Sequence, residues 1–218
     1  MSRRRREEDY RCEATSLRGF IKQLAVQYVT HGYWFYVSGT IPEKKDPRAV
    51  DRKLIHRYHI AVSASERCRR KKAGTANLQY LRHGRFFVLL ATHGRHLFFE
   101  DHAETFRDIR EVAVKHGGYS VSYRNGHASV GIERSEYNRL KAYFEDRAVQ
   151  RSPAWLSEEL ARLDYEPYAP VRRQLLCIFR AVNEARQAAG LSRLTGTPFR
   201  FAPRPCKPFE PTLLAVAA

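Results

Sequence analysis

Between residues 33 and 148, segments that predict strands and segments that predict helices follow one another in a defined order. Runs rich in aromatic and β-branched residues indicate strands, and apolar residues recurring every three or four positions indicate helices. The order is strand, helix, strand, strand, helix, strand, strand, helix, over 33–41, 46–58, 85–92, 96–99, 100–116, 119–123, 128–132 and 136–148. Asn125-Gly126, between the last two strands, is a strong signal for a two-residue hairpin turn.

The first six of these segments have the order βαββαβ, so we expect an α+β protein with a ferredoxin-like antiparallel sheet. Such a plan packs helices on one face of the sheet and leaves the other face free, and nucleic-acid modules often use the free face. Helical stripes over 153–163 and 170–189 predict an added C-terminal helical lobe.

These patterns divide the chain into four regions. We expect a disordered N-terminus over 1–14, an α+β core over 15–150, the helical lobe over 151–190 and an arm over 191–218. The arm alternates Phe with Arg or Lys and is rich in proline, so we expect it to become ordered on binding a partner.

The positive charge of the chain is large and clustered. There are 39 Lys and Arg against 23 Asp and Glu, a formal net charge of +16, and no acidic residue lies between Glu66 and Glu100. Clustered cations indicate a surface for a polyanion, because each Lys or Arg near a phosphate releases condensed counterions. The predicted nucleic-acid-binding residues are Arg67, Arg69, Arg70, Lys71, Lys72, Arg82, Arg85 and Arg95, Arg172, Arg173, Arg180 and Arg186 on the last helix, and Tyr123 with Arg124 at a hairpin tip.

The kind of nucleic acid follows from what the sequence lacks. It has no helix-turn-helix or zinc-finger signature, so RNA or single-stranded DNA is favoured over duplex reading in the major groove. The cysteines Cys12, Cys68, Cys177 and Cys206 form no CxxC pair, which argues against a zinc ribbon and fits a reducing cytoplasm. No apolar run approaches the roughly 18–20 residues of a membrane span, so we expect no membrane association.

Three histidines, His93, His96 and His102, gather around one predicted hairpin. A catalytic metal site needs three converging ligands, which Glu100 or Asp101 could complete. The alternative is neutral histidines at a turn that contact phosphate, and under this interpretation the protein needs no cofactor.

The order of elements is similar to that of HUH single-strand endonucleases and transposases. Those enzymes carry a His-hydrophobe-His pair on a central strand and a nucleophilic tyrosine on a following helix. The resemblance implies His93 and His96 as ligands of Mg²⁺ or Mn²⁺, and Tyr137 or Tyr143 as the nucleophile. The chain departs from the pattern, because His96-Leu97-Phe98 supplies only the first histidine of the pair. Whether the protein is an enzyme therefore stays open at this point.

Three further stretches, NLQYLRHGRFFVLLA from Asn77, GGYSVSY from Gly117 and YAPVRRQLLCIFRA from Tyr168, resemble a family of small, basic, multi-copy bacterial proteins. The likeness covers most of residues 17–201 and implies a mobile-element origin, without assigning catalytic residues. A third possibility is an accessory subunit of a ribonucleoprotein or transposase complex, in which the heptad-like last helix binds a protein partner.

Overall fold

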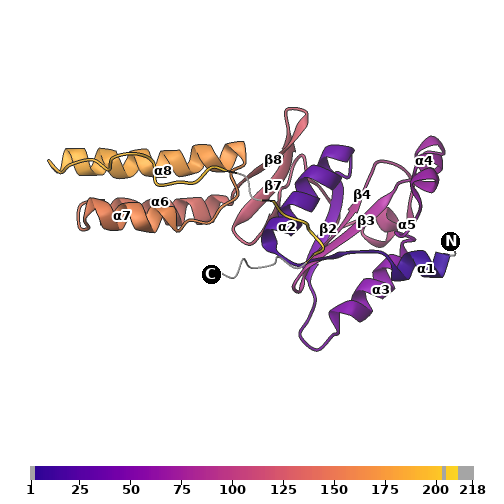
Figure 1. Cartoon of the computed structure of the whole chain (residues 1–218). Helices are drawn as coiled ribbons and strands as arrows, with labels where there is room; N and C mark the ends of the chain where they lie inside the picture. Colours follow the sequence, from indigo (N-terminus) through magenta and orange to yellow (C-terminus); the bar gives the residue numbers. More distant parts are fainter. Residues whose placement is uncertain (1–2, 203–204, 211–218) are drawn as a thin grey trace. The chain divides into compact units, whose positions relative to one another are not determined.

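The computed structural model describes residues 3–202 and 205–210, which fall into two compact units. Unit 1 comprises Met1–His116, Val121–Ala128 and Cys206–Ala218, and unit 2 comprises Gly117–Ser120 and Ser129–Pro205. The elements of unit 1 are α1 (Arg3–Glu8), β1 (Glu13–Ala14), α2 (Leu17–Lys22), the π-helical η1 (Gln23–Tyr28), the 3₁₀ turn η2 (Val29–His31), β2 (Phe35–Thr40), α3 (Pro47–Arg57), α4 (Ala64–Lys72), β3 (Leu78–His83), β4 (Phe86–Ala91), α5 (Leu97–Asp101), β5 (Arg107–Asp108) and β6 (Val114–His116). The division between the units passes through β7 (Tyr119–Arg124) and β8 (His127–Ile132), and α6 (Arg134–Ala148), α7 (Pro153–Ala161) and α8 (Ala169–Ala188) belong to unit 2 (Figure 1).

The main sheet of unit 1 has five strands in the order β1-β3-β4-β2-β5. β4 is antiparallel to both of its neighbours, with Ala91 opposite Phe35 of β2 and Leu78 of β3, and the short β5 is antiparallel to β2. β1 joins the edge parallel to β3. A second sheet has the order β6-β7-β8. The α+β class expected from the sequence is therefore confirmed.

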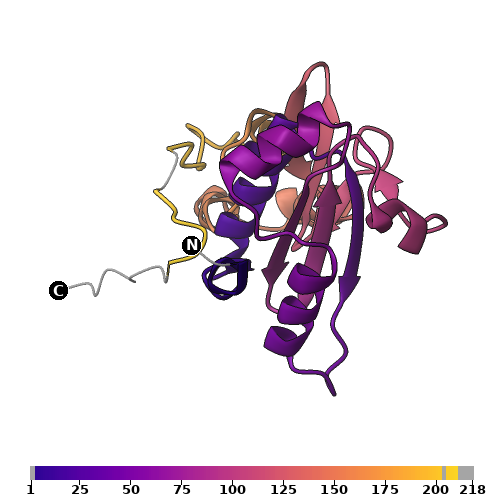
Figure 2. The same ribbon diagram turned by 90° about the vertical axis from the view of Figure 1, so that its right-hand side faces the viewer.

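Helices cover both faces of the main sheet. On one face, side chains of β3 and β4 pack with Ile55 and Tyr58 of α3 and with Phe98 of α5. On the other face Leu81, Val88 and Leu90 are fully buried, and Phe20 of α2 contacts the rings at the ends of β3 and β4. Figure 2 shows strands with helices on either side.

The expectation of a free sheet face is therefore wrong. Residues 17–28 form α2 and η1, and Phe20 of α2 packs against that face. On the opposite face of the sheet the ring of Tyr80 is also buried, so it is unavailable to stack on bases.

Three segments between residues 78 and 116 differ from their predicted structures. The range 96–99 begins α5 instead of forming a strand, because the imidazole of His96 accepts the N–H of Phe98 and caps the helix. The predicted helix over 100–116 is replaced by the end of α5 and by the short strands β5 and β6. β3 was not predicted, because five of its six residues are buried and both of its faces are covered, so no alternating pattern marks it.

Unit 2 contains the two helices expected in the C-terminal lobe, α7 and α8, and also α6, which the sequence pattern had placed in the α+β core over 15–150. Ser152 caps α7 and Pro153 takes its first turn, while α6 and α8 lie side by side (Figure 1). Val171, Leu175, Ile178 and Val182 of α8 are at most 2% exposed. The apolar stripe that predicted a protein partner for the last helix is thus buried within the unit itself.

The terminal regions are more ordered than expected wherever the structure describes them. Residues 3–8 form α1 and Cys12 is buried, so the prediction of disorder over 1–14 is wrong for that part. In unit 2, Leu194 is 5% exposed and its N–H is bound by the side chain of Asn183 at 2.8 Å. In unit 1, Thr15 N–H donates to the carbonyl of Pro208 at 3.0 Å. The predicted arm therefore contacts the rest of its unit in each of its described parts, and residues 203–204 and 211–218 lie outside the described residues. No helix within 3–202 and 205–210 has both the length and the apolar character to cross a bilayer.

Candidate functional site

Helix α4 carries the densest cluster of cations in unit 1. Its start is fixed by Ser63, whose hydroxyl accepts the N–H of Glu66 at 3.2 Å. Glu66 in turn pairs with Arg69 at 2.9 Å and Arg70 at 3.7 Å, one turn further along the helix. No residue of α4 is buried, so capping and side-chain pairing, rather than burial of an apolar stripe, maintain this helix.

Backbone hydrogen bonds bring Arg95 to the C-terminal end of α4. Its N–H donates to the carbonyl of Gly74 at 2.9 Å, and its carbonyl accepts the N–H of Ala76 at 3.1 Å. The side chains of Arg69, Lys71, Lys72 and Arg95 are exposed. We call these four residues the basic ridge.

The other two arginines of α4 attach the helix to the preceding loop. Arg67 donates to the carbonyl of Val62 at 2.8 Å, and Arg70 donates to the carbonyl of His59 at 3.2 Å. Both side chains are half-buried. They keep their charge beside the ridge, but part of their hydrogen-bonding capacity is used within the protein.

Arg82 does not belong to this surface, and its prediction as a phosphate contact is wrong. It is 2% exposed and pairs with Asp51 at 2.9 Å and with Glu13 at 3.0 Å, while Tyr80 donates to Asp51 at 2.7 Å. Burial opposes the charge of Arg82, but the hydrogen bonds from its guanidinium to Asp51 and Glu13 outweigh it and raise its pKa. Burial and Asp51 together raise the pKa of the Tyr80 phenol. The group is a buried ion pair that joins α3 to β3.

Arg85 and Arg186 both bind backbone carbonyls, Arg85 from a half-buried position and Arg186 from a buried one. Arg85 donates to the carbonyls of Pro42, Glu43 and Lys45 and holds the turn before α3. Arg186 is 3% exposed, and its guanidinium binds the carbonyl of Ala148 at the end of α6 and those of Arg151 and Ser192 in the segments after α6 and α8. For Arg186 burial rules out contact with a phosphate, and for Arg85 the carbonyls take up its donors.

Comparison with known proteins adds no relative. No protein-family model matches this chain, and no curated protein sequence matches it. The function must therefore be argued from the geometry alone, and the resemblance to multi-copy bacterial proteins remains a prediction.

The remaining predicted cations are exposed. Arg172, Arg173 and Arg180 lie on the outer side of α8 in unit 2. Arg124 lies at the tip of the β7–β8 hairpin. Its neighbour Tyr123 donates to the carbonyl of Gly126 at 2.8 Å, and its ring packs on Trp34 with 5.1 Å between centroids. Tyr123 therefore stabilises the hairpin, and one side of its ring is already covered.

The predicted histidine group is not assembled as a metal site. His93 is exposed, His96 caps α5, and Nε2 of His102 lies 3.0 Å from the hydroxyl of Tyr58. Burial lowers the pKa of both His96 and His102. Across the described residues, no three His, Cys, Asp or Glu side chains are grouped to hold a metal ion.

The candidate nucleophiles are in the other unit. Tyr137 and Tyr143 lie on α6 of unit 2 and are half-buried, and the guanidinium of Arg147 lies 3.8 Å from the ring centroid of Tyr143. His93 and His96 belong to unit 1. Neither unit by itself contains the set of residues that an HUH mechanism needs.

A histidine pair that the sequence did not reveal lies beside α2. Nδ1 of His83, at the end of β3, is 2.9 Å from Nε2 of His116 in β6. The His116 ring stacks on Phe86 at 4.1 Å and meets the edge of Phe20. Burial and the neighbouring His83 lower the pKa of His116 to about 4, and burial lowers that of His83. The two residues are far apart in sequence, so no local pattern announces the pair.

This pair predicts loss of stability in acid. A pKa below the ordinary 6.5 means that the unfolded chain binds more protons, so the stabilisation is complete above about pH 6.5 and is lost as the pH falls towards 4. After discounting for partial exposure, we expect a loss of about 1–2 kcal/mol in the free energy of unfolding over this range. Urea titrations at several pH values would measure it. His116→Gln, which does not titrate, should flatten the profile, and an unchanged slope in this variant would contradict the assignment.

Proposed function

We propose that the protein binds RNA or single-stranded DNA through phosphate contacts made by the basic ridge. The observation that carries this proposal is the attachment of Arg95 to the end of α4, which gathers cations from separate parts of the sequence. Among the described residues no carboxylate is paired with Lys71, Lys72 or Arg95. Three of the four ridge cations are therefore available to an external anion.

The expected salt dependence of nucleic-acid binding follows from counterion release. The logarithm of the binding constant changes with the logarithm of salt concentration by about −0.7 for each phosphate neutralised on a single strand. Four ridge cations would give a slope of about −3. Such contacts carry no sequence information, so we expect binding that depends strongly on salt and weakly on sequence.

The topology of the sheet supports a ferredoxin-like core as part of this proposal. Strands β2, β3, β4 and β5 follow one another in the chain with α3 and α4 after β2, and α5 after β4, and they lie in the order β3-β4-β2-β5. This order supports our proposal that the core is a βαββαβ unit. Since α2 covers the face that such modules use for bases, we propose phosphate contact at the ridge in place of base stacking on the sheet.

The test is a salt series with a ridge variant. Lys71→Gln, Lys72→Gln and Arg95→Gln together should weaken binding of a short RNA or single-stranded DNA roughly tenfold to a hundredfold near 0.1 M salt. The salt slope should fall by about 2 in magnitude. Fluorescence anisotropy between about 50 and 200 mM salt, with a chelator present, measures both quantities.

A matched variant separates ridge contacts from overall charge. Lys44→Gln, Lys45→Gln and Lys53→Gln remove the same number of exposed cations from the turn before α3 and from α3 itself. This control should change the affinity much less than the ridge variant does. Equal losses in the two variants would show that net charge, not the ridge, holds the nucleic acid, and no binding by the unaltered chain would refute the proposal outright.

A further inference from the structure

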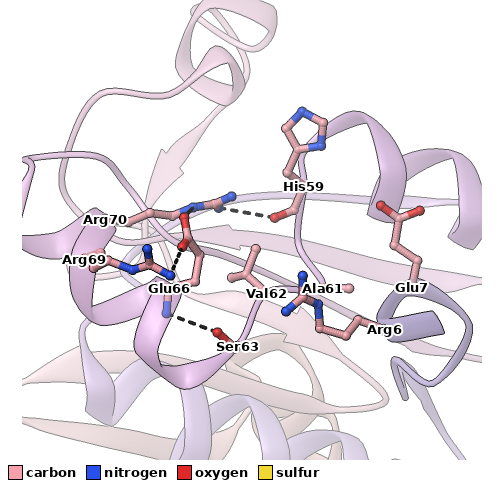
Figure 3. A pocket seen from close by; sticks show the side chains of 9 residues that line it. All are labelled: Arg6, Glu7, His59, Ala61, Val62, Ser63, Glu66, Arg69 and Arg70. Carbon is pink, nitrogen blue, oxygen red and sulfur yellow. Dashed lines mark hydrogen bonds and ion pairs between the residues drawn. The ribbon is translucent and has the colours of Figure 1, made fainter. Parts of the chain in front are cut away.

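A cavity of about 270 Å³ opens beside the N-terminal end of α4 (Figure 3). Its lining comes from α1, from the loop after α3 and from α4, and consists of Arg6, Glu7, His59, Ala61, Val62, Ser63, Glu66, Arg69 and Arg70. Pockets for whole small-molecule ligands usually measure about 300–1,000 Å³. A site slightly below that range fits a single charged group better than a complete cofactor.

Arg6 brings a guanidinium group to the cavity. Figure 3 shows its side chain reaching past Ala61 towards Val62, on the side of the cavity opposite Arg70. The Nε atom is buried and has no hydrogen-bond acceptor among the described residues. The Arg6 side chain nevertheless lines the cavity, so the positive charge of its guanidinium can attract an anion bound there.

The acids of the cavity do not cancel its positive charge. Glu66 forms ion pairs with Arg69 and Arg70, and Glu7 also interacts with another group of the protein. Three arginines therefore face two carboxylates, which leaves one cation in excess. The first N–H groups of α4 have no acceptor within the helix, and they add partial positive charge at Ser63.

His59 shapes the same wall. Its φ of 50° lies in the left-handed region, which residues other than glycine adopt rarely, and its carbonyl accepts a hydrogen bond from Arg70. The bent loop thus holds Arg70 against the cavity (Figure 3). Strained backbone of this kind is common where a ligand is bound.

We infer that this cavity binds the terminal phosphate monoester of a nucleic-acid strand, an inference that rests on the function proposed above. A monoester carries a charge of about −1.5 to −2 near neutral pH and three acceptor oxygens, whereas a phosphate within a strand carries one charge. A recessed site can admit the end of a strand, while the exposed ridge on the same helix contacts the phosphates that follow. The cavity therefore recognises the phosphorylated end of the strand, and the ridge supplies affinity that does not depend on whether the end carries a phosphate.

The experiment compares one oligonucleotide sequence with a phosphate at the 5′ end, a phosphate at the 3′ end, or hydroxyl groups at both ends. We expect one phosphorylated form to bind roughly tenfold more tightly than the hydroxyl form. Arg6→Gln should abolish this preference and leave the affinity for the hydroxyl form unchanged. Arg11→Gln, an exposed arginine just beyond α1, is the matched control and should keep the preference.

The outcomes separate this inference from the function on which it rests. Equal affinity for all three forms overturns the inference while the proposed ridge binding stands. If no form binds, both fall. Loss of affinity for every form in the ridge variant, with the preference retained, supports both. Inorganic phosphate should weaken binding of the phosphorylated strand and leave binding of the hydroxyl form unchanged. A nucleoside monophosphate that binds as tightly as the phosphorylated strand would overturn the assignment to a strand end.

Discussion

Replacement of Asp51 by alanine is expected to lower the free energy of unfolding by about 3–5 kcal/mol. Asp51 is 6% exposed and accepts hydrogen bonds from both Arg82, which is 2% exposed, and the hydroxyl of Tyr80. Removing the carboxylate leaves a guanidinium buried with only the exposed Glu13 and one backbone carbonyl as partners. The cost is large because Arg82 cannot reach bulk water from β3 without breaking the packing of α3 on the sheet.

Urea denaturation followed by circular dichroism measures the effect, with Arg52→Ala as the control. Arg52 is the next residue of α3 and is exposed, so its replacement should change the free energy of unfolding by less than about 0.5 kcal/mol. A double variant in which Asp51 and Arg82 both become apolar should recover part of the loss, since no unpaired charge then remains buried. A loss below about 1 kcal/mol in Asp51→Ala would show that water reaches the pair and that it belongs to the surface.

The parts of the fold that depend on local signals could be predicted from the sequence. Asp46 caps α3 and accepts the N–H groups of Arg48 and Ala49, as Asp-Pro followed by a helical stripe indicates. The individual helices α6, α7 and α8 and the Asn125-Gly126 hairpin were also predicted, because their apolar stripes and turn residues lie within a few positions of one another. The order of strands in the sheet could not be predicted from such local signals, since β3 is buried on both faces and β5 has only two residues.

In the candidate site, local sequence patterns predicted some residues and missed others. The cations of α4 were predicted because they adjoin one another in the chain, but no pattern distinguishes Arg95 on the ridge from Arg82 in the core. Arg82 is buried because Asp51 faces it from another element, and Arg186 because carbonyls at helix ends surround it. Arg6 was missed because a run of arginines followed by acids is typical of a disordered terminus. These assignments depend on contacts between distant residues, which composition and periodicity do not encode.

Replacement of Gly94 by alanine is expected to cost about 3 kcal/mol and to weaken nucleic-acid binding although no charge is removed. Gly94 has a φ of 137°, and a Cβ atom there would lie 2.6 Å from the N atom of Ala76 and 2.8 Å from the carbonyl carbon of Thr75. Both are backbone atoms that cannot move aside cheaply. The chain must therefore separate at the two hydrogen bonds that attach Arg95 to the end of α4.

Gly84→Ala provides the matched comparison, because Gly84 also has a positive φ, of 59°, but has open space around its Cβ position. Its backbone strain alone should cost about 1–2 kcal/mol and should leave the affinity for RNA or single-stranded DNA unchanged. Hydrogen exchange should show lost protection of the Ala76 and Arg95 amides in Gly94→Ala only. If Gly94→Ala is destabilised yet binds with full affinity and an unchanged salt slope, then the position of Arg95 is irrelevant to binding. The ridge would in that case reduce to the cations of α4, whose placement follows from helix geometry alone.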